Sequence, residues 1–316
     1  MGQRRHNLRT TMHRVTPLWL SEALSAALGE DVWMKMDCFQ PVASFKIRGI
    51  GRLCREMVEQ GAARIVSSSG GNAGYAMAYA CRGLGVPATV VVPATTSEFM
   101  RAKIRAVGAE VLEHGDSWDD AHAHASVLAA DPDAAYVHPF DHPAIWEGHA
   151  SLVEEMANQG PKPGVMIVSV GGGGLLCGIL EGMHRVGWSD VPVLAVETEG
   201  AESFKAAADA GQLVTLAAIR SVAKTLGART VTAKLLEWKK RHEIVHWIAT
   251  DRQSVDGCLR FLDDHRILVE PACGAALAAV YQRCGYLQGR GPVAVEVCGG
   301  AGVSLELLRQ WDCQVG

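Results

Sequence analysis

Ser44-Phe45-Lys46 places a lysine in the first turn of a predicted helix, which Ser44 is expected to cap and which runs to about Gln60. The helix dipole and partial burial both favour a neutral amine at that position. A neutral lysine is a nucleophile that can form a Schiff base with a carbonyl compound. By itself the triplet fits an ordinary solvated lysine better, so the chemistry depends on the segments around it.

Two turns, each between a predicted strand and a predicted helix, could bind anions. The first, Ser67 to Gly74, has three serine hydroxyls, the amide of Asn72 and backbone N–H groups at a helix start, which together suit a carboxylate. The second is Gly171 to Gly174, where backbone amides can approach a phosphate monoester closely. It is no dinucleotide fingerprint, because Leu176 and Cys177 stand where that motif requires glycine.

One cysteine and two pairs of histidines need separate consideration. Cys298 ends the last predicted strand, where ligands of open α/β sheets bind, although it also fits a core cysteine. His242 and His246 match the zinc pattern H-E-x-x-H, which requires a helix. Their surroundings favour a strand, on which the two rings would lie too far apart to share one ion. His122 and His124 lie in a predicted Ala-rich helix and are expected to face solvent.

The composition excludes several classes of protein. The chain has 316 residues, 48% of them hydrophobic, which is enough for about two domains with ordinary cores. A net charge of -4 gives no reason to expect a nucleic-acid partner. No apolar run approaches the ~20 residues that span a membrane. Nine cysteines without close pairs indicate free thiols in a reducing cytoplasm, and the Arg-bearing, acid-free start is expected to be a solvated tail.

Strands and helices alternate along most of the chain. From Arg64 to His138 four predicted strands are separated by three predicted helices, which indicates a parallel sheet covered by helices. A second α/β block follows from about residue 139. Before both, Thr16-Pro17 has the form of an N-cap with proline at the first helical position, so a helix is expected from there to Gly29. Residues 198–240 give no clear pattern.

Taken in order, these segments resemble the fold-type II pyridoxal-phosphate (PLP) enzymes, and within them the L-serine/L-threonine dehydratases of the liver serine dehydratase type. The resemblance covers about residues 16–308 and rests on motifs that are weak singly and specific together. They are Ser44 to Gly51, Ser68 to Gly74, Pro139-Phe140-Asp141, Ile145 to Ser151, Ser169 to Leu176, Ser221 to Lys224, Glu270 to Gly274 and Val297 to Gly300.

The resemblance implies two parallel-sheet α/β domains of the tryptophan synthase β-subunit type. Residues 1–36 plus 142–316 would form a large PLP-binding domain, and residues 37–141 a small domain that closes over the substrate. The implied activity is that of a PLP-dependent ammonia-lyase, which converts L-serine to pyruvate, L-threonine to 2-oxobutanoate, or both. A homodimer is also implied.

The resemblance assigns the cofactor contacts. Lys46 would hold PLP as a Schiff base, and Phe45 would pack on the ring. Asn72 would bond the ring hydroxyl, and Cys298 would face the ring nitrogen and leave it essentially neutral. The remaining contacts would be Gly171, Gly172, Gly173, Gly174, Leu175 and Thr225.

The resemblance also assigns the reacting groups and a cation. Lys46 and Ser69 would be catalytic, with Lys46 as the base that takes the α-proton. The substrate would contact Ser69, Gly70, Gly71, Asn72, Ala73 and Phe140. A monovalent cation, K+, would bind the carboxylate of Glu197 and the carbonyls of Gly171, Ala201, Leu226 and Ala228. The alternative interpretation of Glu197 is a salt-bridged surface residue.

Three positions depart from the family pattern. Ala43 replaces a common glycine, Gly70 replaces the alanine of some members, and Thr225 stands where a small alanine or serine is usual. They leave PLP binding secure and the preferred substrate open. Two alternatives therefore remain. One is a serine racemase, with Ser69 as the second acid/base, or a dehydratase for another β-hydroxy amino acid; the other is a PLP-fold binding subunit without turnover.

Overall fold

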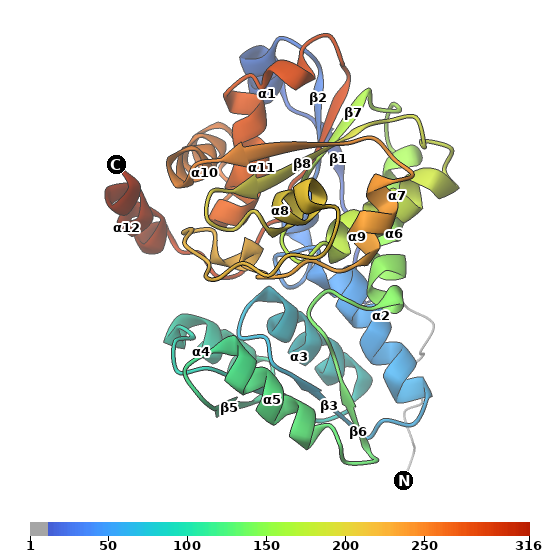
Figure 1. Ribbon diagram of the computed structural model, residues 1–316, viewed down its shortest axis with the longest axis vertical. Coiled ribbons are helices and arrows are strands. Elements are labelled where there is room, and N and C mark those ends of the chain that lie inside the picture. The colour runs from blue at the N-terminus through green and yellow to red at the C-terminus, as the bar shows by residue number, and fades with distance from the viewer. Residues whose placement is uncertain (1–11) are drawn as a thin grey trace. The chain divides into compact units, whose positions relative to one another are not determined.

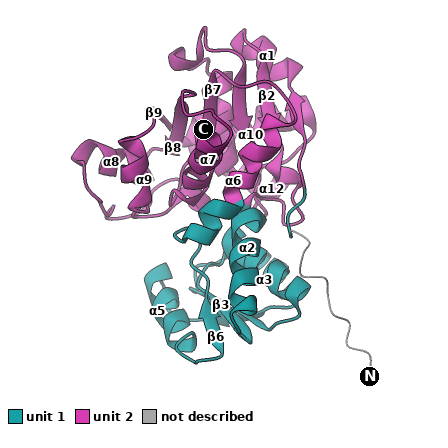
Figure 2. Cartoon of the chain, turned by 90° about the vertical axis from the view of Figure 1, so that its right-hand side faces the viewer, with its two compact units in different colours: residues 1–14, 46–148 teal, residues 15–45, 149–316 magenta. Residues whose placement is uncertain are grey.

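The computed structural model describes residues 12–316 (Figure 1), so most of the predicted solvated tail lies outside the described residues. The chain divides into two compact units (Figure 2). Unit 1 contains Lys46–Gly148 and residues 12–14, and unit 2 contains Val15–Phe45 and His149–Gly316. These divisions differ from the predicted domain boundaries, because residues 37–45 belong to the larger unit and residues 142–148 to the smaller one.

Unit 1 contains a four-stranded parallel sheet in the order β5-β4-β3-β6. Its strands are β3 (Arg64–Ser67), β4 (Ala88–Val92), β5 (Glu110–Glu113) and β6 (Ala134–Tyr136). Its helices are α2 (Lys46–Glu59), α3 (Asn72–Leu84), α4 (Glu98–Ala106), α5 (Trp118–Leu128) and the first part of α6 (Pro143–Ala157). Valines of β3 and β4 pack against small alanines of α5, so this helix covers the sheet closely.

Unit 2 contains a six-stranded sheet in the order β1-β2-β10-β7-β8-β9, parallel except for β1. Its strands are β1 (Leu18–Leu20), β2 (Val32–Lys35), β7 (Val165–Ser169), β8 (Val193–Thr198), β9 (Ile244–Ala249) and β10 (Val293–Glu296). Its helices are α1 (Glu22–Leu28), α7 (Gly174–Arg185), α8 (Ser203–Ala210), α9 (Lys234–Lys239), α10 (Asp251–His265), α11 (Pro271–Tyr281) and α12 (Leu305–Val315). The small residues of α11 let it lie fully buried against the sheet.

The predicted pair of parallel-sheet α/β domains is confirmed, but two local predictions are wrong. Leu18–Leu20 form the edge strand β1, and the helix begins only after Ser21, whose hydroxyl accepts the N–H of Leu24 at 3.1 Å. Antiparallel pairing with β2 overrides the local helix signal there. Ser44 does not cap α2; its backbone instead forms an antiparallel bridge with Gly299.

The strand predicted over the H-E-x-x-H pattern is confirmed, because His246 lies in β9 and His242 just before it. Within residues 12–316 no group of three or more His, Cys, Asp or Glu side chains could hold a metal ion. Among the same residues, no helix is both long and apolar enough to cross a bilayer. Residues 198–240, for which no pattern was clear from the sequence, contain the short helices α8 and α9.

Candidate active site

The four-glycine loop of unit 2 links β7 to α7. Gly173 has φ +93°, and a Cβ on it would lie 2.4 Å from Leu235 Cδ1, so glycine is required there. The first amides of α7, a 12-residue helix, have no acceptor within the helix and carry partial positive charge. A phosphate group therefore fits the loop, as the sequence predicts.

A second segment, residues 225–232, lies against the glycine loop. A Cβ on Gly171 would lie 3.1 Å from Leu226 Cα and 3.3 Å from the carbonyl oxygen of Thr225. Gly172 accepts a hydrogen bond from the N–H of Thr232 at 3.0 Å. The structure therefore brings Thr225 to the predicted phosphate site, although the two segments are far apart in sequence.

Glu270 is a buried carboxylate beside this segment that sequence reasoning assigned no role. It stands at the N-cap of α11, before Pro271, and is 3% exposed. Its Oε2 accepts the hydroxyl of Thr225 at 2.7 Å, and its Oε1 accepts the N–H of Gly302 at 2.5 Å. The Glu-Pro pair before a small-residue helix is the only sequence signal for it.

The backbone of residues 43–45 is paired with the turn that follows β10. The N–H of Phe45 bonds the carbonyl of Cys298 at 3.3 Å, and the N–H of Gly300 bonds the carbonyl of Ala43 at 2.7 Å. The Phe45 ring lies 5.0 Å from the ring of His149. Thus Cys298 and Phe45, both predicted to contact the cofactor, are neighbours in unit 2.

The Cys298 thiol is buried and stays protonated. A hydrogen bond with Cys273 and then burial raise its pKa well above the ordinary value. A protonated thiol carries no charge, so it does not fix a proton on a ring nitrogen as a carboxylate does. The neutral ring nitrogen that the resemblance implies stays a prediction.

Lys46 begins α2 in unit 1, as predicted. Its Nζ donates a hydrogen bond to the carbonyl of Pro139 at 2.8 Å. The amine therefore lies against the Pro139-Phe140-Asp141 segment, which includes the predicted substrate contact Phe140. Lys46 directly follows Phe45, so the division between the two units falls at the peptide bond between them.

His138 organises that segment, a role the sequence did not reveal. Its Nδ1 accepts the N–H of Phe140 at 3.3 Å and of Asp141 at 2.9 Å, and its ring packs edge-on against Phe140. Burial lowers the pKa of His138 to about 4, so Nδ1 is an acceptor at neutral pH. The His-Pro-Phe-Asp order was the available signal.

The turn after β3 gathers the predicted carboxylate contacts at the start of the 13-residue helix α3. Ser69 Oγ accepts the N–H of Gly71 at 3.4 Å. A Cβ on Gly74 would lie 1.8 Å from the Ser69 carbonyl oxygen, so the tight approach requires glycine. Asn72 and Ala73 are buried in the first turn of α3. These residues and Gly70 stand at the N-terminus of α3, whose first amides have no acceptor within the helix, an arrangement that suits a carboxylate.

The predicted cation ligands form two groups. Leu226 lies against Gly171, and its carbonyl accepts the N–H of Ala228 at 2.8 Å. Glu197 is fully buried at the end of β8, so the surface interpretation is wrong. Its Oε1 accepts the N–H of Phe204 at 2.7 Å and its Oε2 that of Lys205 at 2.8 Å, at the start of α8. Ala201 lies in the connection between β8 and α8.

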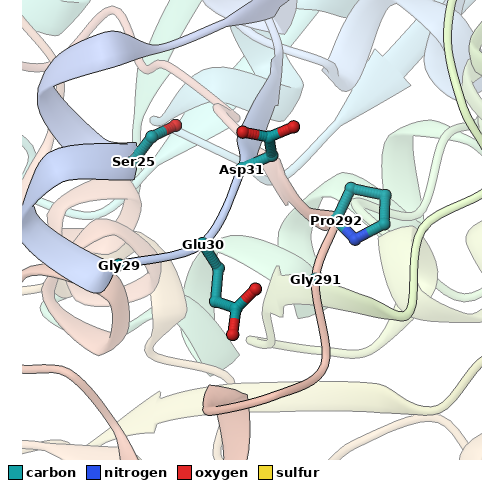
Figure 3. A pocket seen from close by; sticks show the side chains of 6 residues that line it. All are labelled: Ser25, Gly29, Glu30, Asp31, Gly291 and Pro292. Atoms are coloured by element: carbon teal, nitrogen blue, oxygen red, sulfur yellow. The ribbon is translucent and has the colours of Figure 1, made fainter.

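A shallow hollow lies near the amino ends of β2 and β10 (Figure 3). It is lined by the residues that precede β2 and β10, namely Ser25, Gly29, Glu30, Asp31, Gly291 and Pro292. The glycine loop and Cys298 follow the carboxyl ends of β7 and β10, which run parallel. The hollow is therefore separate from the predicted site.

The chain is similar to known proteins of one family. Residues 9–299 match the family described as "Pyridoxal-phosphate dependent enzyme". The chain is 49% identical over 313 residues to a Mus musculus protein named "Serine dehydratase-like", covering 96% of this chain and 95% of that one. It is also 49% identical over 315 residues to the Homo sapiens "L-serine dehydratase/L-threonine deaminase", covering 96% of each chain.

Solved structures show the same fold. A fungal L-serine ammonia-lyase from Rhizomucor miehei superposes with a TM-score of 0.92 at 35% identity, covering 97% of this chain and 100% of that chain. Maize serine racemase superposes with a TM-score of 0.87 at 24% identity, covering 96% of this chain and 92% of that chain, and shows the fold alone. From its match over residues 9–299 and from relatives 49% identical over nearly their whole length, this chain belongs to the pyridoxal-phosphate dependent enzymes.

Proposed function

We propose that this protein is a PLP-dependent ammonia-lyase that acts on L-serine, L-threonine or both. The observation that carries the proposal is Lys46, a half-buried amine at a helix start that contacts the Pro139 carbonyl. It directly follows Phe45, whose backbone pairs with the protonated thiol residue Cys298. Relatives named as L-serine dehydratases support the choice of substrate.

Unit 2 supplies the cofactor-binding residues. Gly171–Gly174 and Leu175 hold the phosphate through backbone amides and the positive end of α7. Thr225 borders this loop, and Phe45 would pack on the cofactor ring. Cys298 would be the group beside the ring nitrogen, and it is neutral because its thiol keeps its proton.

Unit 1 supplies the reacting groups. Lys46 would hold the cofactor through its amine and, as a neutral amine, would take the α-proton of the substrate. Ser69 and the amides of residues 70–73 bind the substrate carboxylate, and Asn72 bonds the ring hydroxyl. Phe140, whose N–H bonds His138 Nδ1, would contact the substrate beside Lys46.

Bound PLP supplies an electron-withdrawing ring that stabilises negative charge on the substrate Cα. Removal of the α-proton by Lys46 and departure of the β-hydroxyl together remove one water molecule. The enamine released from the site takes water back in solution, which gives ammonia and a 2-oxo acid. The product is pyruvate from serine and 2-oxobutanoate from threonine.

Borohydride reduction followed by peptide mapping tests the role of Lys46. We expect a pyridoxyl group on Lys46 in the wild-type protein and none in Lys46→Ala, while the exposed Lys162→Ala is labelled as the wild type is. In unreduced portions of the same preparations, ammonia and 2-oxo acids are measured with L-serine and L-threonine, the 2-oxo acids by coupling to lactate dehydrogenase. A label on another lysine, or unreduced wild-type protein with bound PLP that releases no ammonia from either substrate, would refute the proposal.

Chiral chromatography of the remaining serine tests the alternative function. An ammonia-lyase leaves the remaining serine in the L form. Appearance of D-serine at a rate comparable with that of pyruvate would assign racemisation to the same site.

A monovalent cation such as K+ is also part of the proposal. Glu197 contributes a buried carboxylate, and Gly171, Ala201, Leu226 and Ala228 contribute carbonyls. Ser203, at the start of α8 next to Phe204, supports it as well: it is fully buried, and its Oγ has no hydrogen-bond partner among residues 12–316. Dialysis into a buffer with a bulky organic cation should lower activity, and KCl should restore it. Equal activity in both buffers would refute the proposed cation site.

We further propose a homodimer in the cytoplasm. The thiols of the described chain are all free, as in a reducing compartment. Trp19 and Leu20 of the edge strand β1, with Phe39 5.3 Å from Trp19, expose apolar area that a second copy could cover. Light scattering on the purified protein should give twice the chain mass, and Trp19→Asp should lower it; a monomeric wild-type protein would contradict the proposal.

A further inference from the structure

Tyr136, at the end of β6, connects the Ser67–Gly74 turn to the helix α5. Its hydroxyl oxygen lies 2.7 Å from Ser68 Oγ on one side and 2.7 Å from His122 Nδ1 on the other. The expectation that His122 faces solvent is wrong, because its ring is held between two aromatic rings. The ring of Trp118 stacks on it at 4.8 Å, and the ring of Tyr136 meets it edge-on at 5.2 Å.

The three serines of the turn have different partners. Ser67 Oγ donates to the carbonyl of Val137 at 3.1 Å, and Ser68 Oγ bonds Tyr136. Both serines are fully buried. Val137 and Tyr136, at the end of β6, thus bond Ser67 and Ser68 of the turn, respectively. Ser69 is half-buried, and its Oγ accepts a long hydrogen bond from the N–H of Gly71.

The hydrogens in the series of hydrogen bonds from Ser68 through Tyr136 to His122 can be counted. A phenol has one hydrogen to donate, so Tyr136 donates one of its two bonds and accepts the other. Burial raises the pKa of Tyr136, so the hydroxyl keeps its hydrogen at neutral pH. With His122 Nδ1 as acceptor, Ser68 donates to Tyr136 and Tyr136 donates to His122; in the tautomer with the hydrogen on Nδ1, both bonds reverse. In either direction every link is satisfied.

We infer that Tyr136, held by His122, is a positioning residue for the substrate carboxylate. It fixes Ser68 and thereby the adjacent hydroxyl of Ser69 and the amides that follow it. Loss of the Tyr136 hydroxyl frees Ser68 to turn, so the binding surface must be ordered when the substrate arrives, at a cost in affinity. The inference rests on the proposed assignment of this turn to the substrate.

Tyr136→Phe tests the inference with little disturbance of packing. The ring lies against the core cluster of Val66, Val91, Ala121 and Ala125, and phenylalanine keeps that contact. We expect the KM for L-serine to rise about three- to tenfold, the range for one lost hydrogen bond, and kcat and the Kd for PLP to stay within about twofold of wild type. The matched control is Tyr79→Phe, which removes a phenolic oxygen from α3 in the same unit and should leave KM unchanged.

Two substitutions at His122 test the second link. His122→Asn keeps a polar atom near the position of Nδ1 and should keep KM within about twofold of wild type. His122→Leu removes that atom and should raise KM, by less than Tyr136→Phe does. An unchanged KM in Tyr136→Phe, or an equal rise in Tyr79→Phe, would overturn the inference.

Amide hydrogen exchange of residues 68–74 gives a readout that needs no turnover. In the cofactor-free protein, exchange in this turn should be faster in Tyr136→Phe than in wild type and unchanged in Tyr79→Phe. If the wild-type protein releases ammonia from neither L-serine nor L-threonine, the proposed function fails, and exchange alone decides the inference. Equal exchange in Tyr136→Phe and wild type then refutes it.

Discussion

The hydroxyl of Thr225 donates a hydrogen bond to Oε2 of Glu270 at 2.7 Å, next to the glycine loop of unit 2. Glu270 is 3% exposed, so its carboxylate depends on donors supplied by the protein. The resemblance leads us to expect a small alanine or serine at this position; alanine could not make this bond, whereas serine could. The departure thus has a defined structural partner in this chain.

Thr225→Ala should lower the free energy of unfolding by about 1–2 kcal/mol, because a buried carboxylate loses one donor. The Kd for PLP should rise more than the KM for L-serine, since the carbonyl of Thr225 faces the position of a Cβ on Gly171 at 3.3 Å. Thr225→Ser keeps the hydroxyl and should behave as wild type. Urea unfolding and fluorescence titration with PLP measure both effects; unchanged PLP affinity in Thr225→Ala would contradict the expectation.

Lys35 is a fully buried cation in unit 2 whose removal should be costly. Its Nζ donates to Glu155 Oε2 at 2.6 Å, to Gln159 Oε1 at 2.8 Å and to the carbonyl of Thr16 at 2.7 Å. Lys35→Met leaves the carboxylate without this cation and should lower the free energy of unfolding by about 3–5 kcal/mol. The double variant Lys35→Met/Glu155→Leu should recover most of that loss in denaturant titrations. A double variant no more stable than the single one would show that the pair is not the cause.

Ala43 has φ +57°, in the left-handed region that favours glycine. Both its backbone groups are bonded, the N–H to Gln40 and the carbonyl to Gly300, so the conformation is held in place. Ala43→Gly relieves the strain but adds flexibility to the unfolded chain, and we expect a net gain of about 0.5–1 kcal/mol. Ala43→Val should be less stable than wild type. Thermal unfolding of the three proteins checks this order, and a lower Tm for Ala43→Gly would contradict it.

Sequence patterns predicted elements whose signals are local. The β-branched run at Ala88–Val92 forms β4, and the glycine loop has the positive φ at Gly173 that four glycines allow. The pairing of Leu18–Leu20 with β2 could not be seen, because it depends on a strand that comes later in the chain. The same holds for the bridge between Ser44 and Gly299.

In the site, the sequence identified residues by type and missed those that hold them. Lys46 and the turn at Ser69 were given roles by the resemblance of several segments taken together, because the Ser44-Phe45-Lys46 triplet alone fits an ordinary solvated lysine better. Tyr136 and Glu270 act through partners that are distant in sequence, so their residue types alone carry no signal. His138 has short-range partners, but accepting amides through Nδ1 requires the buried loop that only the fold provides.

The buried ring of His138 makes stability depend on pH. Its pKa is lowered from 6.5 to about 4 by burial, so the unfolded chain takes up a proton between these values and the folded chain does not. The contribution of His138 is complete above pH 6.5, decreases as the pH falls toward 4, and is constant below that. Unfolding free energies measured from pH 4 to 7 should show one proton fewer taken up on unfolding in His138→Gln than in wild type. Equal slopes in the two proteins would mean that His138 is not the titrating group.

Gly70 faces a side chain that an added methyl would displace. A Cβ on Gly70 would lie 2.7 Å from both Cγ2 and Oγ1 of Thr96 and 3.1 Å from Val92 Cγ1. Thr96 is half-buried in a loop and can rotate, so Gly70→Ala should fold, with the turn shifted away from Thr96.

Because this turn is assigned to the substrate and the phosphate loop belongs to the other unit, Gly70→Ala should lower kcat for L-serine by about tenfold, equivalent to 1.4 kcal/mol, and change the Kd for PLP much less. The double variant Gly70→Ala/Thr96→Ala removes the displaced side chain and should recover most of the lost kcat, while Thr96→Ala alone should leave kcat close to wild type. Steady-state kinetics with PLP occupancy measured on the same samples separates the two effects. Loss of PLP from Gly70→Ala, with unchanged kcat per bound cofactor, would show that the turn serves the cofactor and not the substrate carboxylate.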